Sequence, residues 1–186
     1  MLLLIFLSFA IWKTFKLGEC RKKVSASGDQ LMFTECSWIE NLKLYSLVYT
    51  DYFNNRIFFH DKTENKTSIL IYRYSKYMCE SCIQEDLQEI EFFQKEIGKE
   101  KILLLPAYPN NRAGMIELSN VLAKFNYVNI PSDSLLIPLQ NGDFLQRYFA
   151  IIDRDGNLNM VFFPRNGEKN LTRIYFSEVK KELLTE

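Results

Sequence analysis

The stretch YRYSKYMCESCIQEDLQEI, residues 72–90, decides the fold. At its centre Cys79 and Cys82 stand three positions apart, at the point where the sequence pattern changes. Residues 68–75 before the pair form a β-branched and aromatic run of strand length. After the pair, apolar residues recur every three or four positions, as on one face of a helix: Ile83, Leu87, Ile90, Phe93 and Ile97. A CxxC pair at such a junction is typical of a redox-active dithiol, of a pair of metal ligands or of a structural disulfide that closes a loop.

The rest of the chain alternates between strands and helices. Gly98 ends the first helix in the manner of a C-terminal cap. The elements expected after it are a strand at 101–108, a helix at 115–125, strands at 147–152 and 158–164, and a helix at 173–184. The first two strands are joined by a helical crossover and should therefore be parallel. The turn DRDGN, residues 153–157 with Gly156, predicts an antiparallel hairpin between the next two.

Composition and charge restrict the class of protein. The chain has 186 residues, which suits one domain plus a leader. Hydrophobic residues make up 47% and charged residues 25%, which is enough for a packed core. Lys plus Arg equals Asp plus Glu at 23 each, so no basic surface for nucleic acid is expected.

The N-terminus reads as a targeting segment. Residues 2–12 are continuously apolar except for Ser8, but they fall short of the ~20 residues of a typical membrane-spanning helix. They fit the apolar region of an export signal. We expect residues 1–20 to be a signal or membrane anchor, which places the protein in the periplasm or on a membrane facing it. Cys20 either carries lipid, pairs with Cys36 or stays free.

Upstream of the CxxC stretch, the chain gives weaker signals. Residues 21–30 are polar and read as a linker, whereas 42–49 and 56–59 read as strands. A zinc site normally needs four ligands, but His60 is the only histidine and the two early cysteines lack a matching spacing. We therefore expect neither a metal nor a cofactor.

The order strand, CxxC helix, strand, helix, hairpin, helix resembles the thioredoxin fold. The motifs SILIYRYSKYMCESC at 68–82 and YFAIIDRDGNL at 148–158 resemble the exported thiol-disulfide oxidoreductases of the TlpA/ResA-like type. This resemblance covers residues 67–186. It implies an α/β fold with a mixed central sheet and flanking helices, preceded by an N-terminal β extension within 21–66 and by the apolar leader.

The resemblance also implies roles for individual residues. Cys79, at the N-terminus of the helix, would be the nucleophile, because unpaired N–H groups there stabilise a thiolate. Cys82 would resolve the mixed disulfide. Three residues are candidates for tuning the pair: Glu80 would raise the pKa of Cys79, while Arg73 and Arg147 would lower it. Arg147 stands where this family usually has a cis-proline.

These expectations lead to a thiol-disulfide oxidoreductase that acts outside the cytoplasm on protein thiols or disulfides. The missing proline leaves an alternative open, namely a thioredoxin-like binding domain with weak or no catalysis.

Overall fold

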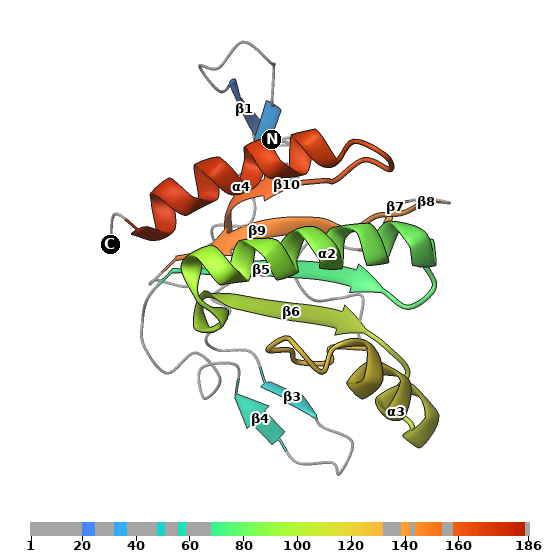
Figure 1. Ribbon diagram of the computed structural model, residues 1–186. Helices are drawn as coiled ribbons and strands as arrows, with labels where there is room; N and C mark the ends of the chain where they lie inside the picture. Colours follow the sequence, from blue (N-terminus) through green and yellow to red (C-terminus); the bar gives the residue numbers. More distant parts are fainter. Residues whose placement is uncertain are drawn as a thin grey trace, which may run out of the picture.

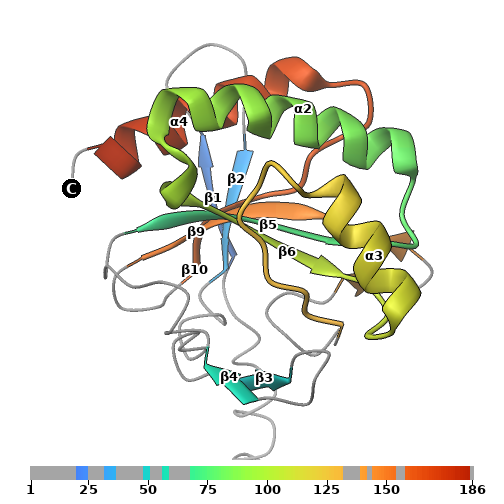
Figure 2. The same ribbon diagram turned by 60° about the horizontal axis from the view of Figure 1, so that its bottom comes forward.

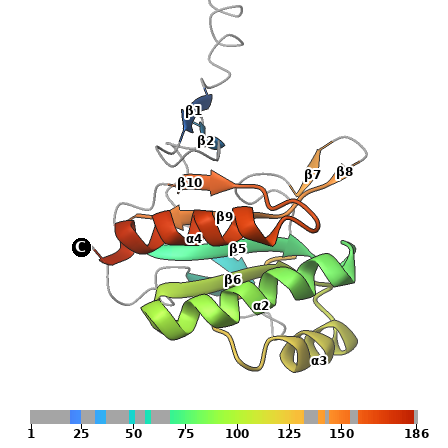
Figure 3. The same cartoon turned by 45° about the horizontal axis from the view of Figure 1, so that its top comes forward.

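The core of the molecule is a four-stranded mixed sheet (Figures 1 and 3). The computed structural model describes residues 20–24, 32–36, 48–50, 56–58, 68–131, 139–141, 144–153 and 158–184. The strand order is β10-β9-β5-β6, with bounds Leu158–Phe162, Tyr148–Ile152, Ile69–Ser75 and Ile102–Ala107. Strand β5 is parallel to β6 and antiparallel to β9, and β9 is antiparallel to β10. The predicted mixed sheet is confirmed.

Two helices cover one face of this sheet. Helix α2, Glu80–Ile97, and helix α4, Lys169–Leu184, lie side by side above it (Figure 2). Helix α3, Arg112–Val121, follows β6 and lies at that end of the sheet (Figures 1 and 2). A short 3-10 helix, η4, Lys99–Lys101, joins α2 to β6.

Strand β5 divides the core in two because successive side chains point to opposite faces. Leu70, Tyr72 and Tyr74 belong to the cluster shared with α2 and α4. Ile71 belongs to the second cluster, on the other face, with residues from the segment after α3. All seven residues of β5 are buried, as expected for a central strand with both faces covered.

Helix α2 agrees with the apolar spacing that predicted it. Its buried side includes Ile83, Leu87, Ile90 and Phe93. It ends at Gly98, which has φ 96° and donates its backbone N–H to the carbonyl of Gln94. A residue with a Cβ is strained at this angle, which explains the glycine.

Helix α3 is displaced toward the N-terminus of the range predicted for it, 115–125. It begins earlier because the side chain of Asn111 caps it, accepting a hydrogen bond from the Gly114 N–H at 2.9 Å. It ends earlier because the following chain extends beside β6, where the N–H of Val128 bonds to the carbonyl of Leu104. That extension closes the outer edge of the sheet.

Helix α4 begins four residues before the predicted start at Arg173. The turn that precedes it uses Gly167, whose φ of 77° suits glycine. The N–H of Leu171 then bonds to the carbonyl of Glu168, which starts the helical pattern. The apolar positions that predicted this helix begin only in its second turn.

The N-terminal part corrects one prediction. An antiparallel hairpin of β1, Cys20–Val24, and β2, Met32–Cys36, includes part of the range read as a linker. The run Arg21-Lys22-Lys23 lacks the apolar alternation that marks a strand, although its backbone pairs like any other. A second small hairpin joins β3, Val48–Thr50, to β4, Arg56–Phe58. Strand β4 lies inside its predicted range, and β3 extends one residue beyond the predicted end at residue 49.

A third hairpin, β7 Gln140–Asn141 with β8 Phe144–Leu145, was not predicted. Residues 1–19 and the turn at 154–157 lie outside the described residues, so the leader and the Gly156 turn stay predictions, as does the domain boundary at 66/67. Within the described ranges, no helix combines the length and the apolarity needed to cross a membrane.

Candidate redox site

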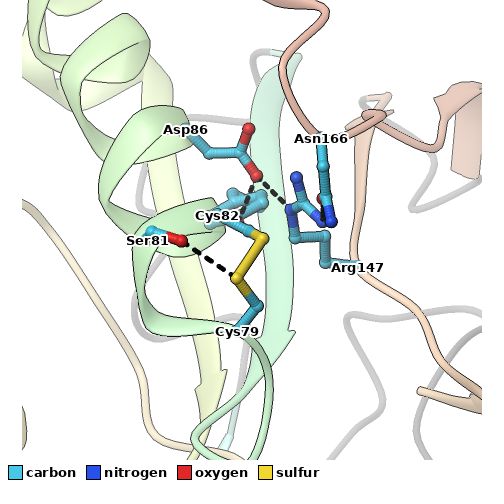
Figure 4. The surroundings of a disulfide bond; sticks show 7 residues. Cys79, Ser81, Cys82, Asp86, Arg147 and Asn166 are labelled. Atoms are coloured by element: carbon cyan, nitrogen blue, oxygen red, sulfur yellow. Dashed lines mark hydrogen bonds and ion pairs between the residues drawn. A yellow bond between two sulfur atoms is a disulfide. The ribbon is translucent and has the colours of Figure 1, made fainter.

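The two cysteines of the CxxC motif form a disulfide at the start of α2 (Figure 4). Their Cα atoms are 5.3 Å apart. Cys79 is the N-cap residue of α2, and its carbonyl accepts the first helical hydrogen bond from Ile83. Cys79 is exposed, whereas only 5% of Cys82 is exposed. One sulfur is therefore open to a partner and the other is shielded behind it.

The first turn of α2 places a hydroxyl near the sulfur of Cys79. The Ser81 hydroxyl lies 3.1 Å from the Cys79 Sγ. The N–H groups of a first helical turn have no intrahelical partner and favour a negative charge at the N-cap. Glu80, the first residue of the helix, is exposed and adds a carboxylate to the same turn. The helix terminus and Glu80 thus act in opposite directions on a Cys79 thiolate.

A buried carboxylate lies behind the disulfide. Asp86 follows Cys82 by one helical turn, so both lie on one side of α2, and only 4% of Asp86 is exposed. Its Oδ2 accepts a hydrogen bond of 2.6 Å from the Tyr72 hydroxyl and forms an ion pair with Nε of Arg147. Figure 4 shows Asp86 and Arg147 together on the Cys82 side of the disulfide.

Sequence reasoning missed Asp86. A signal was present: an acidic residue four positions after Cys82 interrupts the inward side of an amphipathic helix.

Burial controls the charges in this cluster. It raises the pKa of Asp86 above the ordinary value, and the hydrogen bonds from Arg147 and Tyr72 oppose that rise. Burial, followed by the charge of Asp86, raises the pKa of Tyr72 well above its usual value, so Tyr72 stays a donor. A carboxylate with a raised pKa is more basic than an ordinary one, which suits it to accept a proton.

Arg147 immediately precedes β9 and joins three parts of the chain. Its guanidinium contacts Asp86 on α2, and its Nη1 donates to Oδ1 of Asn166 at 2.9 Å, in the loop before α4. Only 9% of it is exposed, so this side chain is buried and does not point to solvent. Its charge is paired with that of Asp86. The described residues contain no cis peptide bond.

Arg73 does not lie beneath the disulfide. It alternates with Tyr72 and Tyr74 along β5 and is therefore directed to the sheet face away from α2. Its Nη1 donates to the carbonyls of Leu105 at 2.9 Å and Ile130 at 2.8 Å. The structure thus places this tuning candidate in the second core and apart from the two cysteines.

The loop between β5 and α2 presents an exposed aromatic ring next to the disulfide. Tyr77 is 72% exposed, two residues before Cys79. Lys76 beside it is ion-paired with Glu117 of α3 and lies 5.7 Å from the ring centre of Tyr108. These contacts fix the loop that delivers Cys79 to the surface. Among the described residues, no group of three or more metal-ligating side chains occurs.

Comparison with solved structures confirms the thioredoxin-like fold. A candidate thiol-disulfide oxidoreductase from Bacteroides vulgatus aligns with a TM-score of 0.50 and 17% identity, over 72% of this chain and 86% of its own. A candidate protein disulfide isomerase from Bacteroides thetaiotaomicron aligns with a TM-score of 0.50 and 9% identity, over 74% and 85%. No family profile and no curated protein sequence matches the chain.

Proposed function

We propose that this protein is a thiol-disulfide oxidoreductase that acts outside the cytoplasm on protein thiols or disulfides. The observation that carries the proposal is the pairing of an exposed Cys79 at a helix N-terminus with a shielded Cys82. Such a terminus stabilises the attacking thiolate, and the second thiol one turn later is positioned to complete the exchange. The fold shared with the compared structures supports the same chemistry.

The exchange proceeds in two steps. In the reduced protein, the Cys79 thiolate attacks a sulfur of the substrate disulfide, forming a mixed disulfide and releasing one substrate thiolate. Cys82 then attacks the Cys79 sulfur, which releases the second substrate thiolate and forms the Cys79–Cys82 disulfide. Two electrons pass from the dithiol to the substrate. The reverse sequence oxidises a substrate dithiol.

Asp86 supplies the proton transfer that the second step needs. A thiol has an ordinary pKa of about 8.5 and attacks only as a thiolate, so a shielded Cys82 must lose its proton. Asp86 lies one helical turn away in the same buried region, with its pKa raised by burial. Its carboxylate accepts the proton directly or through a water, while Arg147 holds it in place.

Two features favour polypeptide substrates and a location outside the cytoplasm. Exposed Tyr77 beside the disulfide provides an aromatic surface for an extended chain, as aromatic residues do at many interfaces. The apolar run at residues 2–12 fits an export signal or anchor. An exported dithiol meets protein disulfides that persist there.

Trapping of mixed disulfides tests this function. Cys82→Ser should accumulate mixed disulfides with substrate proteins, because the resolving thiol is absent. Cys79→Ser should neither trap substrates nor reduce the disulfides of insulin. Both are read on non-reducing gels, with the wild-type protein as the reference.

Equal trapping by the two variants would contradict the assigned roles. If the wild-type protein reduces no disulfide and the Cys82→Ser variant traps nothing, the alternative function would hold instead, namely a thioredoxin-like binding domain with weak or no catalysis.

A further inference from the structure

The N-terminal hairpin places the two remaining cysteines directly opposite each other. Strands β1 and β2 pair antiparallel, and their register begins with Cys20 opposite Cys36 and ends with Val24 opposite Met32. Directly opposite residues in an antiparallel pair lie on the same face of the sheet. Sequence spacing gave no reason to pair these cysteines, since fifteen residues separate them.

The backbone distances of such a pair match those of a disulfide. Opposite residues in antiparallel strands have Cα atoms about 4.5 Å or about 5.5 Å apart, depending on whether they exchange hydrogen bonds. A disulfide spans Cα separations of about 4.4–6.8 Å. Both kinds of opposite pair fall inside this range, so the register that sets Cys20 opposite Cys36 gives a Cα separation that a disulfide can span.

We propose that Cys20 and Cys36 form a second, structural disulfide that closes the β1–β2 hairpin. One cysteine thiolate attacks a disulfide oxidant, of small-molecule or protein class, and forms a mixed disulfide. The other attacks that mixed disulfide, so the two thiols lose two electrons and the oxidant becomes two thiols. The Cys20 sulfur is then consumed and cannot carry lipid.

The position of the hairpin gives this bond a structural role. Strand β2 lies close to β10, the strand at one end of the central sheet. The β1–β2 hairpin is a two-stranded sheet of its own, and an isolated hairpin is marginally stable in water. A cross-strand bond at its open end constrains the unfolded chain and holds β2 in place beside β10. This role does not depend on exchange at Cys79 and Cys82.

Peptide mapping of the full chain tests the pairing. The protein is oxidised with glutathione disulfide under native conditions, remaining thiols are alkylated, and trypsin digestion follows without reduction. Cleavage after Lys and Arg places Cys20 in peptide 17–21, Cys36 in peptide 24–43 and both CxxC cysteines in peptide 77–95. In most molecules we expect peptides 17–21 and 24–43 to be linked, with a mass two hydrogen atoms below the sum of the two free peptides. Peptide 77–95 should carry an internal disulfide between Cys79 and Cys82.

Two controls make the result specific to the fold. Oxidation in denaturant should scramble the four cysteines among the three pairings that they allow. In Cys36→Ser, the Cys20 peptide should become alkylated while 77–95 stays closed. The double variant Cys79→Ser/Cys82→Ser should lose exchange activity and keep the 17–21 to 24–43 link, which separates this proposal from the proposed function.

Three results would overturn the second disulfide. These are Cys20 and Cys36 both alkylated after native oxidation, a lipid mass on Cys20 in protein isolated from a bacterial host, or a link between either peptide and 77–95 in the native protein.

Discussion

At the scale of single residues, the buried Tyr72–Asp86–Arg147 cluster is the feature that most needs explaining. Burying charged groups costs free energy unless they are paired and hydrogen-bonded. Here both conditions are met, since Asp86 accepts from Tyr72 and is paired with Arg147. Ionisable groups with perturbed pKa values gather at functional sites, and this cluster lies behind a dithiol. Both considerations point to chemistry at Cys82.

Asp86→Asn tests the proton transfer. The amide keeps the shape of the side chain and still accepts hydrogen bonds, but it cannot take a proton from Cys82. We expect resolution of a mixed disulfide at Cys79 to slow by about 100-fold, the lower range for a positioned general base. Rapid-quench measurement of the released thiol against pH would show this. The pH dependence due to Asp86 should vanish as well.

Glu85→Gln is the matched control for that variant. Glu85 is the neighbouring acidic residue on α2, and its carboxylate is near Lys169, outside the buried cluster. The charge of Glu85 is the smallest of the causes that act on the pKa of Asp86, so the rate of this variant should stay close to that of the wild type. Equal rates for Asp86→Asn and Glu85→Gln would remove Asp86 from the mechanism.

Arg147→Met tests the charge balance of the cluster. Removing the cation takes away an interaction that lowers the pKa of Asp86, so this pKa should rise further. When folding raises the pKa of a carboxyl group, the group stabilises the protein fully at pH values below the pKa that it has in the unfolded chain. This stabilisation is lost as the pH rises through the pKa that it has in the folded protein. The variant should therefore be near wild type in acid and lose roughly 3–5 kcal/mol above the folded pKa of Asp86, as when a buried pair is broken.

Urea unfolding across a pH series would measure that loss. Adding Asp86→Asn to Arg147→Met should restore most of the stability, because no unpaired charge remains in the core. A loss that is the same at every pH would show that Arg147 acts by packing alone.

At the scale of elements, the contact between α2 and α4 rests on aromatic packing. Phe93 of α2 and Phe176 of α4 stack with ring centres 4.5 Å apart and planes 11° from parallel. Phe176 also meets Phe149 of β9 edge-to-face at 5.1 Å. The side chain of Arg173 adds two hydrogen bonds of 2.8 Å to Glu89. The two helices and the sheet are therefore joined through one cluster.

Two neighbouring phenylalanines on α2 provide a matched test of this packing. Phe93 is 5% exposed and Phe92 is 59% exposed. Phe93→Ala should lower the free energy of unfolding by roughly 3–5 kcal/mol, as expected for a large buried side chain. Phe92→Ala should change it by no more than about 0.5 kcal/mol. Denaturant unfolding of both variants decides this, and similar losses would contradict the orientation of α2.

At the scale of the whole molecule, we predict that the N-terminal segment determines where the domain is located. Residues 1–30 fused to a reporter that is active only outside the cytoplasm should give activity, because the apolar run at 2–12 fits an export signal. A fusion of residues 13–30 lacks this run and should be silent. Equal activity of the two fusions, or silence from both, would refute export by this segment.

The sequence by itself determined the elements around the CxxC motif and their order. Strand β5, helix α2 and its end at Gly98 follow from side-chain period and from local backbone angles, which depend on neighbours within a few residues. The parallel pairing of β5 and β6 follows from the connection between them. The positions of Cys79 and Cys82 at the start of the helix were predicted for the same reason.

Only the tertiary structure decided which distant side chains meet. Arg147 and Asp86 are 61 positions apart, and nothing in the local pattern of either one indicates the other. The face occupied by Arg73 depends on how β5 is covered, and the backbone register that sets Cys20 opposite Cys36 depends on how two separate strands pair. Contacts of this kind depend on how the whole chain packs and buries its side chains, so they cannot be predicted from local sequence periodicity.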